Sequence, residues 1–123
     1  MEQQKTTMCP VEVTLSIVGG KWKLQIVHCL LSGTKRFGQL RRLIPVATQQ
    51  MLTLQLRELE QMGILHRQVY AQVPPKVEYS LTELGRSLEP IIRQIYQWGE
   101  WYCEQNNIAY WRVSNHPEDH VSA

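Results

Sequence analysis

The sequence predicts an α+β domain that is mostly helical and carries one β-hairpin. In several segments of the 123-residue chain, apolar residues recur with helical spacing. The stretch 64–81 is instead rich in β-forming residues and is interrupted by Val73-Pro74-Pro75, which cannot continue a ladder. Hydrophobic residues make up 43% of the chain, which is enough for one modest core in a single domain.

Two helices are expected before residue 34. Pro10 suits the first turn of a short helix that the Gly19-Gly20 pair ends. The segment 21–33 continues with apolar residues at helical spacing and closes at Ser32-Gly33, where Gly33 fits a left-handed C-terminal position.

The next two helices form a tight pair. A β-compatible segment, residues 34–37, leads into a brief helix over 38–44 that Pro45 must end. Thr48 is a good N-cap for a strong helix that runs to Gly63 and has a polar outer face. Two helices joined in this way are typical of a helix-turn-helix.

A hairpin and a long helical segment follow. Strands over 64–72 and 76–81 come directly after the second helix of the pair, as the wing of a winged helix does. We prefer Thr82 to Ser80 as the cap of the last segment, and Pro90 is expected to kink or divide it.

The predicted fold is therefore a winged helix-turn-helix with a β-hairpin wing and additional N- and C-terminal helices. We expect the domain to span residues 9–112, between a flexible N-terminus over 1–8 and a flexible tail over 113–123.

Charge is distributed unevenly along the chain, although its net value is only +2. Residues 14–57 contain no acidic residue but seven of the 13 basic ones. The rest of the chain therefore carries six basic against 11 acidic residues, or −5. A positive half on a nearly neutral protein suits a polyanion such as DNA, because Lys and Arg displace counterions from phosphates. A solvated basic face without a partner is the alternative.

The cysteines and histidines do not predict a metal site. Cys9, Cys29 and Cys103 are far apart, and no Cys/His cluster has the spacing of zinc ligands. We expect no cofactor and no metal. No apolar run approaches the roughly 20 residues of a membrane span, and the N-terminus has no apolar core of a signal peptide. A cytoplasmic protein without a membrane partner is expected.

Several motifs together resemble one family. They are Cys-Pro at the first helix, Gly-Gly-Lys-Trp, Arg-Phe-x-x-Leu-Arg, Leu-x-x-Leu-Glu-x-x-Gly and Val-Glu-Tyr-x-Leu-Thr-x-x-Gly, within residues 9–102. This set resembles the HxlR-type regulators, winged-helix transcription factors of bacteria. The resemblance implies a homodimer that binds double-stranded DNA at an inverted-repeat operator, often with a cysteine near the N-terminus that senses oxidants or electrophiles.

The helix that begins after Thr48 would lie in the major groove. The amides of Gln49 and Gln50 suit adenine, and Thr53 suits a thymine methyl group. We favour base contacts, and solvated helix surface is the alternative. Six further residues are candidates for phosphate contacts: Arg36, Arg41, Arg42, Arg57, Lys21 and Lys23. For Lys21 and Lys23, exposed surface without a DNA contact is the alternative. Lys76, beside the wing tip, either reaches the neighbouring minor groove or belongs to ordinary turn chemistry.

The terminal helices are expected to form a dimer seam. The last helix carries more apolar surface than one small domain can cover, and such aromatic patches mark interfaces. The interface residues we expect are Val11, Leu15, Ile91, Ile95, Trp98, Trp101 and Tyr102. Part of this surface must also serve the protein's own core.

Cys9 is the candidate sensor. It precedes Pro10 at a helix N-terminus, where the helix dipole favours a reactive thiolate. Its modification by a small oxidant or electrophile, or a disulfide, would shift the DNA-binding geometry. Cys103 or a small thiol is the candidate disulfide partner, and Cys29 is expected to be inert in the core.

Two other functions compete with a DNA-binding regulator. A catalytic site is not expected, because no Ser/His/Asp order, carboxylate pair or phosphate-binding glycine loop is present. A thiol oxidoreductase built on Cys9 is the one enzyme worth testing, by turnover of a peroxide or quinone. A winged-helix module that binds only proteins would show DNA affinity independent of salt.

Overall fold

The computed structural model describes residues 7–111. The flexible segments expected over 1–8 and 113–123 lie outside this range, apart from residues 7 and 8.

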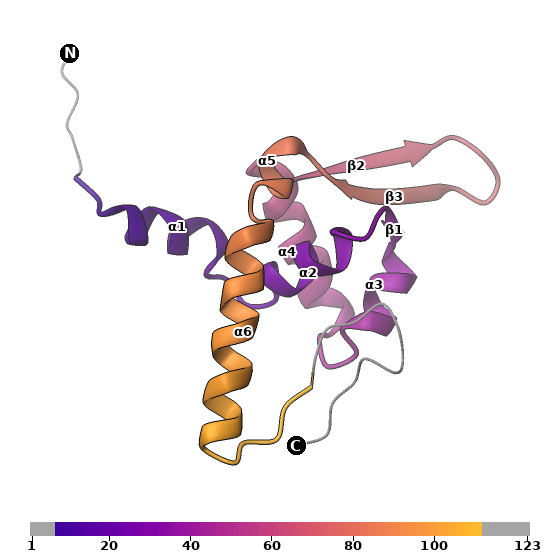
Figure 1. Cartoon of the computed structure of the whole chain (residues 1–123). Coiled ribbons are helices and arrows are strands. Elements are labelled where there is room, and N and C mark those ends of the chain that lie inside the picture. The colour runs from indigo at the N-terminus through magenta and orange to yellow at the C-terminus, as the bar shows by residue number, and fades with distance from the viewer. Residues whose placement is uncertain (1–6, 112–123) are drawn as a thin grey trace.

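Helices and strands follow the predicted order. They are α1 (Pro10–Val18), α2 (Lys23–Leu30), β1 (Lys35–Arg36), α3 (Phe37–Leu43), α4 (Gln49–Gln61), β2 (Leu65–Tyr70), β3 (Lys76–Leu81), α5 (Glu83–Arg86) and α6 (Glu89–Gln105). Figure 1 shows α1 standing apart from the other elements, whereas the β2–β3 hairpin extends on the opposite side.

The sheet has three antiparallel strands in the order β1-β3-β2. Its hairpin register pairs Leu65 with Leu81 at the base and Tyr70 with Lys76 at the tip. β3 has the predicted bounds, whereas β2 is shorter than the expected 64–72 at both ends.

The core lies where α2, α3, α4 and α6 meet beneath the base of the sheet. Helical spacing brings one apolar stripe of each helix inward, as the sequence predicts. The side chains fully buried there include Ile26, Leu30, Leu40, Ile44, Leu52, Leu56, Leu59 and Ile92.

Both predicted threonine caps are confirmed. The Thr48 hydroxyl accepts a hydrogen bond of 3.1 Å from the Met51 amide, which satisfies a free donor at the start of α4. Thr82 accepts one of 3.1 Å from the Gly85 amide, so the cap is Thr82 and not Ser80. The long final segment is divided before Pro90, which occupies the first turn of α6, where its missing N–H is not needed.

The start of the second helix was predicted too early. α2 begins at Lys23, because Trp22 has a left-handed backbone with φ of 74° and cannot belong to the helix. α2 also ends earlier than the expected Ser32-Gly33, at Leu30, although Gly33 has a positive φ of 138°.

Candidate nucleic-acid interface

The outer face of α4 gathers the residues predicted to read DNA. Gln49, Gln50 and Arg57 are exposed, and Thr53 is half-buried. Together with Thr48 and Leu54 they line one surface hollow. Leu54 is 49% exposed, as expected for a residue on the rim of the packed stripe. The amides of Gln49 and Gln50 at the start of α4 therefore face solvent.

Thr53 has an internal partner. Its hydroxyl donates a hydrogen bond of 2.8 Å to the carbonyl of Gln49, one turn earlier in α4. Since the hydroxyl proton is used within the helix, its methyl group is the part suited to a DNA contact. This fits the predicted apolar contact with a thymine methyl.

A second hollow extends this face toward the wing and contains an arginine that was not among the predicted site residues. Arg67 of β2 lines it together with Arg57 and Thr53 of α4, and Tyr79 of β3. Thr53 and Arg57 line both hollows, so the two are adjacent. An exposed arginine in the first half of a predicted wing strand was the signal that could have identified Arg67.

The predicted phosphate contacts before α4 are also exposed. Arg36 is the N-cap residue of α3, and its backbone amide donates to Gln39 at 2.8 Å. Arg41 and Arg42 occupy the last turn of α3, where they also suit the negative end of the helix dipole. Arg42 lines a separate hollow with Lys35 and Gln39. Basic side chains therefore precede α4 along the chain, on exposed positions of α3.

Lys76 is engaged within the wing. Its Nζ atom lies 3.5 Å from Oε2 of Glu78 and 4.7 Å from the centre of the Tyr70 ring. A hydrogen bond with Glu78 also raises the pKa of Tyr70. A phosphate contact by Lys76 would have to compete with Glu78. At the wing tip, Val73 is 99% exposed.

One expected phosphate contact is wrong. Lys23 is only 4% exposed, because its Nζ atom points between α2 and α4. There it lies 2.5 Å from Gln55 Oε1 and 2.5 Å from Glu58 Oε1. Buried polar partners explain this placement, since a buried ammonium group needs them. Lys21 is exposed, and its Nζ atom lies 5.3 Å from the centre of the Trp22 ring.

The three cysteines differ in environment. Cys9 is the exposed N-cap residue of α1, and its amide donates to Glu12 Oε1 at 2.9 Å. Cys29 is fully buried in the core, where desolvation raises the pKa of its thiol to about 12, although Lys35 opposes the shift. Cys103 is half-buried on α6. The expectation of an inert Cys29 agrees with this burial.

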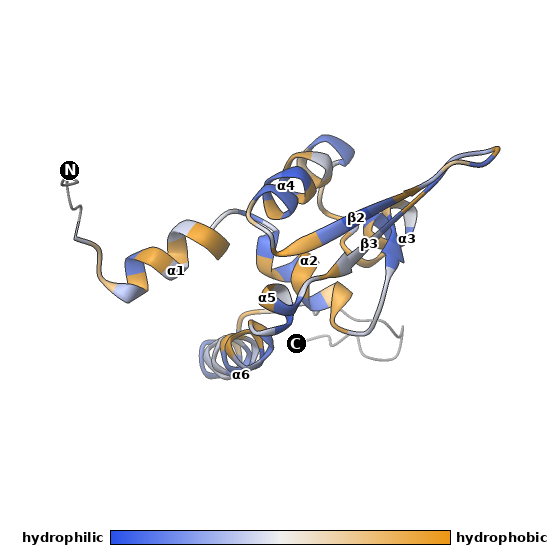
Figure 2. Cartoon of the chain, turned by 90° about the horizontal axis from the view of Figure 1, so that it is seen from above, coloured by the Kyte–Doolittle hydropathy of each residue, from blue (hydrophilic) through white to orange (hydrophobic). Residues whose placement is uncertain are grey.

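The expected interface residues all lie on exposed apolar surface. Val11 and Leu15 of α1 are 63% and 60% exposed, and Trp98 of α6 is 61% exposed. The Trp98 ring stacks on Tyr102 with 5.2 Å between centroids. Figure 2 shows the apolar colour along α1 and on α6, away from the hairpin. The other expected members, Ile91, Ile95 and Trp101, are also exposed.

The part of the chain that the structure describes has neither a cluster of metal ligands nor a membrane-spanning helix. Between residues 7 and 111, no three His, Cys, Asp or Glu side chains gather as metal ligands would. Within that same part of the chain, no helix combines the length and apolar character needed to cross a bilayer.

Comparison with known proteins identifies the family. The model of the HxlR-like helix-turn-helix family matches residues 17–107. This chain belongs to the HxlR-like family. Among its relatives in Bacillus subtilis, the HTH-type transcriptional regulator YdeP is 63% identical over 97 residues, which cover 79% of this chain and 76% of YdeP.

Solved structures of two similar regulators have the same fold. The redox regulator HypR in its oxidized form has a TM-score of 0.71 and 63% identity, over 75% of this chain and 95% of HypR. The reduced form of YodB from B. subtilis has a TM-score of 0.68 and 40% identity, over 80% and 98% of the two chains. The winged helix-turn-helix is thereby confirmed. As an HxlR-like protein, the chain is a DNA-binding transcriptional regulator and not an enzyme.

Proposed function

We propose that two copies of this HxlR-like regulator assemble through α1 and α6 and bind an inverted-repeat operator with their paired α4 helices. Oxidation of Cys9, or its reaction with an electrophile, then changes the binding. The observation that carries the proposal is the continuous exposed face of α4, where Gln49, Gln50 and Arg57 lie together. A DNA partner would place the protein in the cytoplasm of a bacterial cell.

Residues on and around the α4 face have two proposed roles, base recognition and phosphate binding. Gln49 and Gln50, in the first turn, present amides that match the donor and acceptor of adenine. Arg57 and Arg67 lie further along the same face and toward the wing, and Arg41 and Arg42 lie on α3. Arginines at these places would bind phosphates, which fix the position of the helix without reading bases.

Association of two copies would have two effects. It covers apolar side chains on α1 and α6 that are about half or more exposed, such as Leu15, Trp98 and Trp101. It also places two recognition helices on half-sites about 34 Å apart, which doubles the number of bases that the protein contacts. One short recognition helix contacts only a few bases. The stacking of Trp98 on Tyr102 supports an interface, because these rings are already ordered before association.

Support for the redox role comes from position and from relatives. Cys9 is exposed at the start of α1, on the same helix as Val11 and Leu15, so its modification would act directly on the proposed interface. Among the relatives, HypR is named a redox regulator, and YodB has been solved in reduced and diamide-treated forms. The candidate partners of Cys9 in a disulfide are Cys103 and a small thiol.

The test is fluorescence anisotropy with labelled DNA from beside the protein's own gene, over a salt series, before and after diamide. We expect selective binding with a steep salt dependence, and a diamide effect that dithiothreitol reverses. Cys9→Ser should lose the diamide effect and keep DNA binding. Equal, salt-independent affinity for every fragment would overturn the DNA-reading role. An unchanged diamide response in Cys9→Ser would overturn only the sensor.

Sedimentation velocity tests the assembly separately. Trp98→Asp places a charge in the apolar patch of α6 and should produce monomers. Gln97→Asp adds the same charge on the same helix at an exposed polar position and should not. Monomeric wild-type protein, or identical behaviour of the two variants, would contradict an interface on α6.

A further inference from the structure

We propose that the hollow between β1 and α3 binds one phosphate group of the DNA backbone, so that Lys35 and Gln39 join Arg42 as DNA contacts. The hollow measures about 290 Å³ and is lined by Lys35, Gln39, Arg42 and Leu43. Neither Lys35 nor Gln39 was among the predicted site residues. The inference rests on the proposed function, because it adds a phosphate site to the same operator-binding surface.

The polar lining of this hollow offers hydrogen-bond donors. The Lys35 ammonium group donates to Ser32 Oγ at 2.9 Å and to the Gly33 carbonyl at 3.4 Å, which leaves one of its three protons for a ligand. The Oε1 atom of Gln39 accepts from the Arg36 amide at 2.8 Å, so the side-chain NH₂ group remains as a donor. Phosphate oxygens accept hydrogen bonds, and a set of donors with two cations therefore suits them.

Arg42 supplies the second cation of the hollow. Its Nη1 atom would lie 3.9 Å from a Cβ atom at Gly38, so the guanidinium group folds back along α3 by about one turn. A guanidinium group presents a planar fork of donors that can bind two oxygens of one phosphate at once. Lys35 and Arg42 line the same hollow from two elements, β1 and α3, so one phosphate between them would contact both.

No carboxylate pairs with the two cations of the hollow within residues 7–111. The ion pairs in that range belong to other cations, which are Lys23, Lys76 and Arg93. Strand register explains why Lys35 has no acidic partner, since Arg36 is the residue of β1 that lies opposite Glu78 of β3. Successive residues of a strand point to opposite faces of the sheet, so Lys35 and Glu78 lie on different faces. The positive charge of the hollow is therefore available to an anion.

The sheet connects this hollow to the DNA-facing surface. Lys35 of β1 pairs with Tyr79 of β3, and Tyr79 pairs with Arg67 of β2, so the three side chains form one cross-strand row on the same face. Tyr79 and Arg67 also line the hollow that reaches Arg57 of α4. A basic surface thus runs from α4 across the sheet to Lys35. This continuity favours the DNA backbone over a small free anion as the source of the phosphate.

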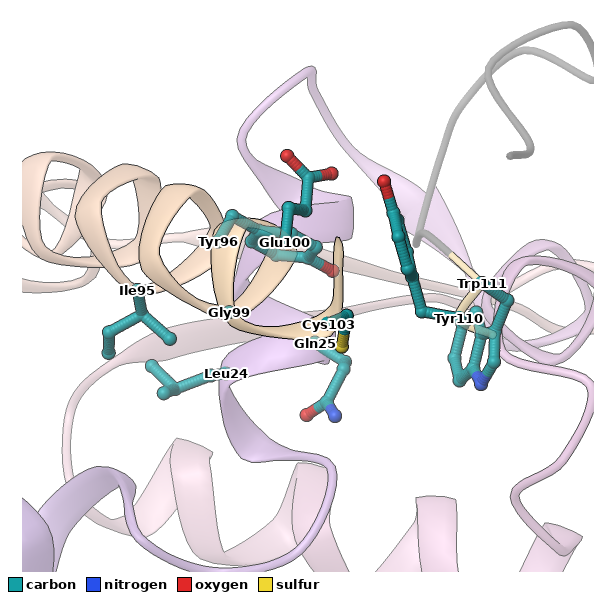
Figure 3. Close-up of a pocket in the computed structure, with 9 residues that line it drawn as sticks. All are labelled: Leu24, Gln25, Ile95, Tyr96, Gly99, Glu100, Cys103, Tyr110 and Trp111. Carbon is teal, nitrogen blue, oxygen red and sulfur yellow. The ribbon is translucent and has the colours of Figure 1, made fainter. Parts of the chain in front are cut away.

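A second cavity of the molecule has a different chemistry. Figure 3 shows it between α2, α6 and the segment after α6, with the rings of Tyr96, Tyr110 and Trp111 around it. Apolar walls of this kind disfavour an oxyanion, which would lose its hydration there. Ile95, one of the expected interface residues, lines this cavity as well. The phosphate site is therefore assigned to the hollow of Lys35 and Arg42.

Neutral linkages in the DNA give a direct test with the full-length protein. In the preferred fragment, single phosphates are replaced in turn by methylphosphonate, which keeps the linkage and removes its charge. At one linkage in each half-site, replacement should weaken wild-type binding roughly tenfold. The same replacement should not weaken Lys35→Met further, because this variant has already lost the contact. Lys35→Arg keeps the charge and should behave as the wild type.

Two more variants complete the design. Arg42→Met should lose the effect of the same linkage, since both cations would bind one phosphate, and it serves as the test if circular dichroism shows Lys35→Met to be unfolded. Arg93→Met removes a cation that is paired with Glu89 on α6 and should keep the wild-type response at every linkage. Lys35→Met should also reduce the salt slope by about 1.

The outcomes separate this site from the proposed function. Selective wild-type binding in which each replaced linkage weakens folded Lys35→Met as much as the wild type would overturn the site and leave the operator-binding role intact. Absence of selective wild-type binding would overturn both. Titration calorimetry with inorganic phosphate tests the other source of this chemistry. Saturable phosphate binding that requires Lys35, without any linkage whose effect depends on Lys35, would overturn the assignment to DNA.

Discussion

The Nζ atom of Lys23 lies 2.5 Å from Oε1 of Glu58, and this ion pair joins the first residue of α2 to α4. The Lys23 side chain is 5% exposed and that of Glu58 is 38% exposed. Gly20 leaves room for the pair, because a Cβ atom there would lie 2.5 Å from the same Nζ. A buried cation thus holds α4 against the start of α2.

Removal of the Lys23 ammonium group should destabilise the domain. Lys23→Met leaves Glu58 and Gln55 without their shared donor, at a cost of about 2 kcal/mol, below the value for a fully buried pair because Glu58 is partly solvated. Urea unfolding measures the loss. Lys21→Met is the matched control on an exposed side chain and should change stability by less than about 0.5 kcal/mol. Equal effects of the two variants would show that the ion pair contributes little.

Two helical glycines should respond oppositely to alanine. At Gly85 the new Cβ atom would lie 2.2 Å from the Ile64 carbonyl oxygen, so backbone must move, and we expect a loss of about 2 kcal/mol or more. At Gly99 the same change meets open space in a helix and should stabilise by about 0.5–1 kcal/mol. Thermal unfolding of both variants gives the comparison. A stable Gly85→Ala would mean that α5 can shift away from Ile64.

Phosphate and base contacts should differ in their effect on DNA binding. Arg42→Ala should weaken binding to all fragments alike and reduce the salt slope by about 1. Gln50→Ala should weaken the preferred fragment selectively, by about 1–3 kcal/mol, and leave the salt slope unchanged. Arg93→Ala, which removes an arginine paired with Glu89 on α6, is the control. A salt slope that Arg42→Ala leaves intact would exclude Arg42 from the interface.

The buried thiol of Cys29 should make stability fall at alkaline pH. Burial raises its pKa to about 12 from the ordinary 9.0, so the folded state keeps a proton that the unfolded state releases. Stability from this group is complete below pH 9.0 and is lost as the pH rises toward 12. The slope from Cys29 should be about 1 kcal/mol per pH unit.

Comparison of variants isolates that slope from other titrations. Urea unfolding at several pH values above 9 should show a shallower decline for Cys29→Ala than for the wild type, although the variant starts from lower stability. Cys9→Ser, which changes an exposed thiol, should keep the wild-type slope. If Cys29→Ala declines as steeply as the wild type, other groups set the alkaline limit.

Local chemistry made much of the fold predictable. Thr48 and Thr82 have the side chains that N-caps need, and Pro74 and Pro75 exclude a continuous strand. The exact start of α2 was not predictable, because the left-handed backbone at Trp22 has no local signature in a residue of this type. Its conformation depends on tertiary packing around it, where the Trp111 ring lies 6.5 Å away.

The candidate site was predictable where a side chain points out of a regular helix. Helical spacing identified the exposed face of α4 with Gln49, Gln50 and Arg57. It failed for Lys23, because a charged residue near a helix start looks exposed until its partners on another helix are known. Arg67 was missed for a related reason, since only the tertiary fold brings β2 beside α4.

The detached position of α1 has a thermodynamic consequence. Only its last turn, with Ile17 and Val18, packs on the core of its own chain. A helix of nine residues is marginal in water without further packing. In the proposed dimer, the order of α1 would therefore be coupled to mass action rather than to the unfolding of the domain. The copy number of the protein in the cell would then set how much of the thiol-bearing helix is formed, and with it how sharply the regulator responds.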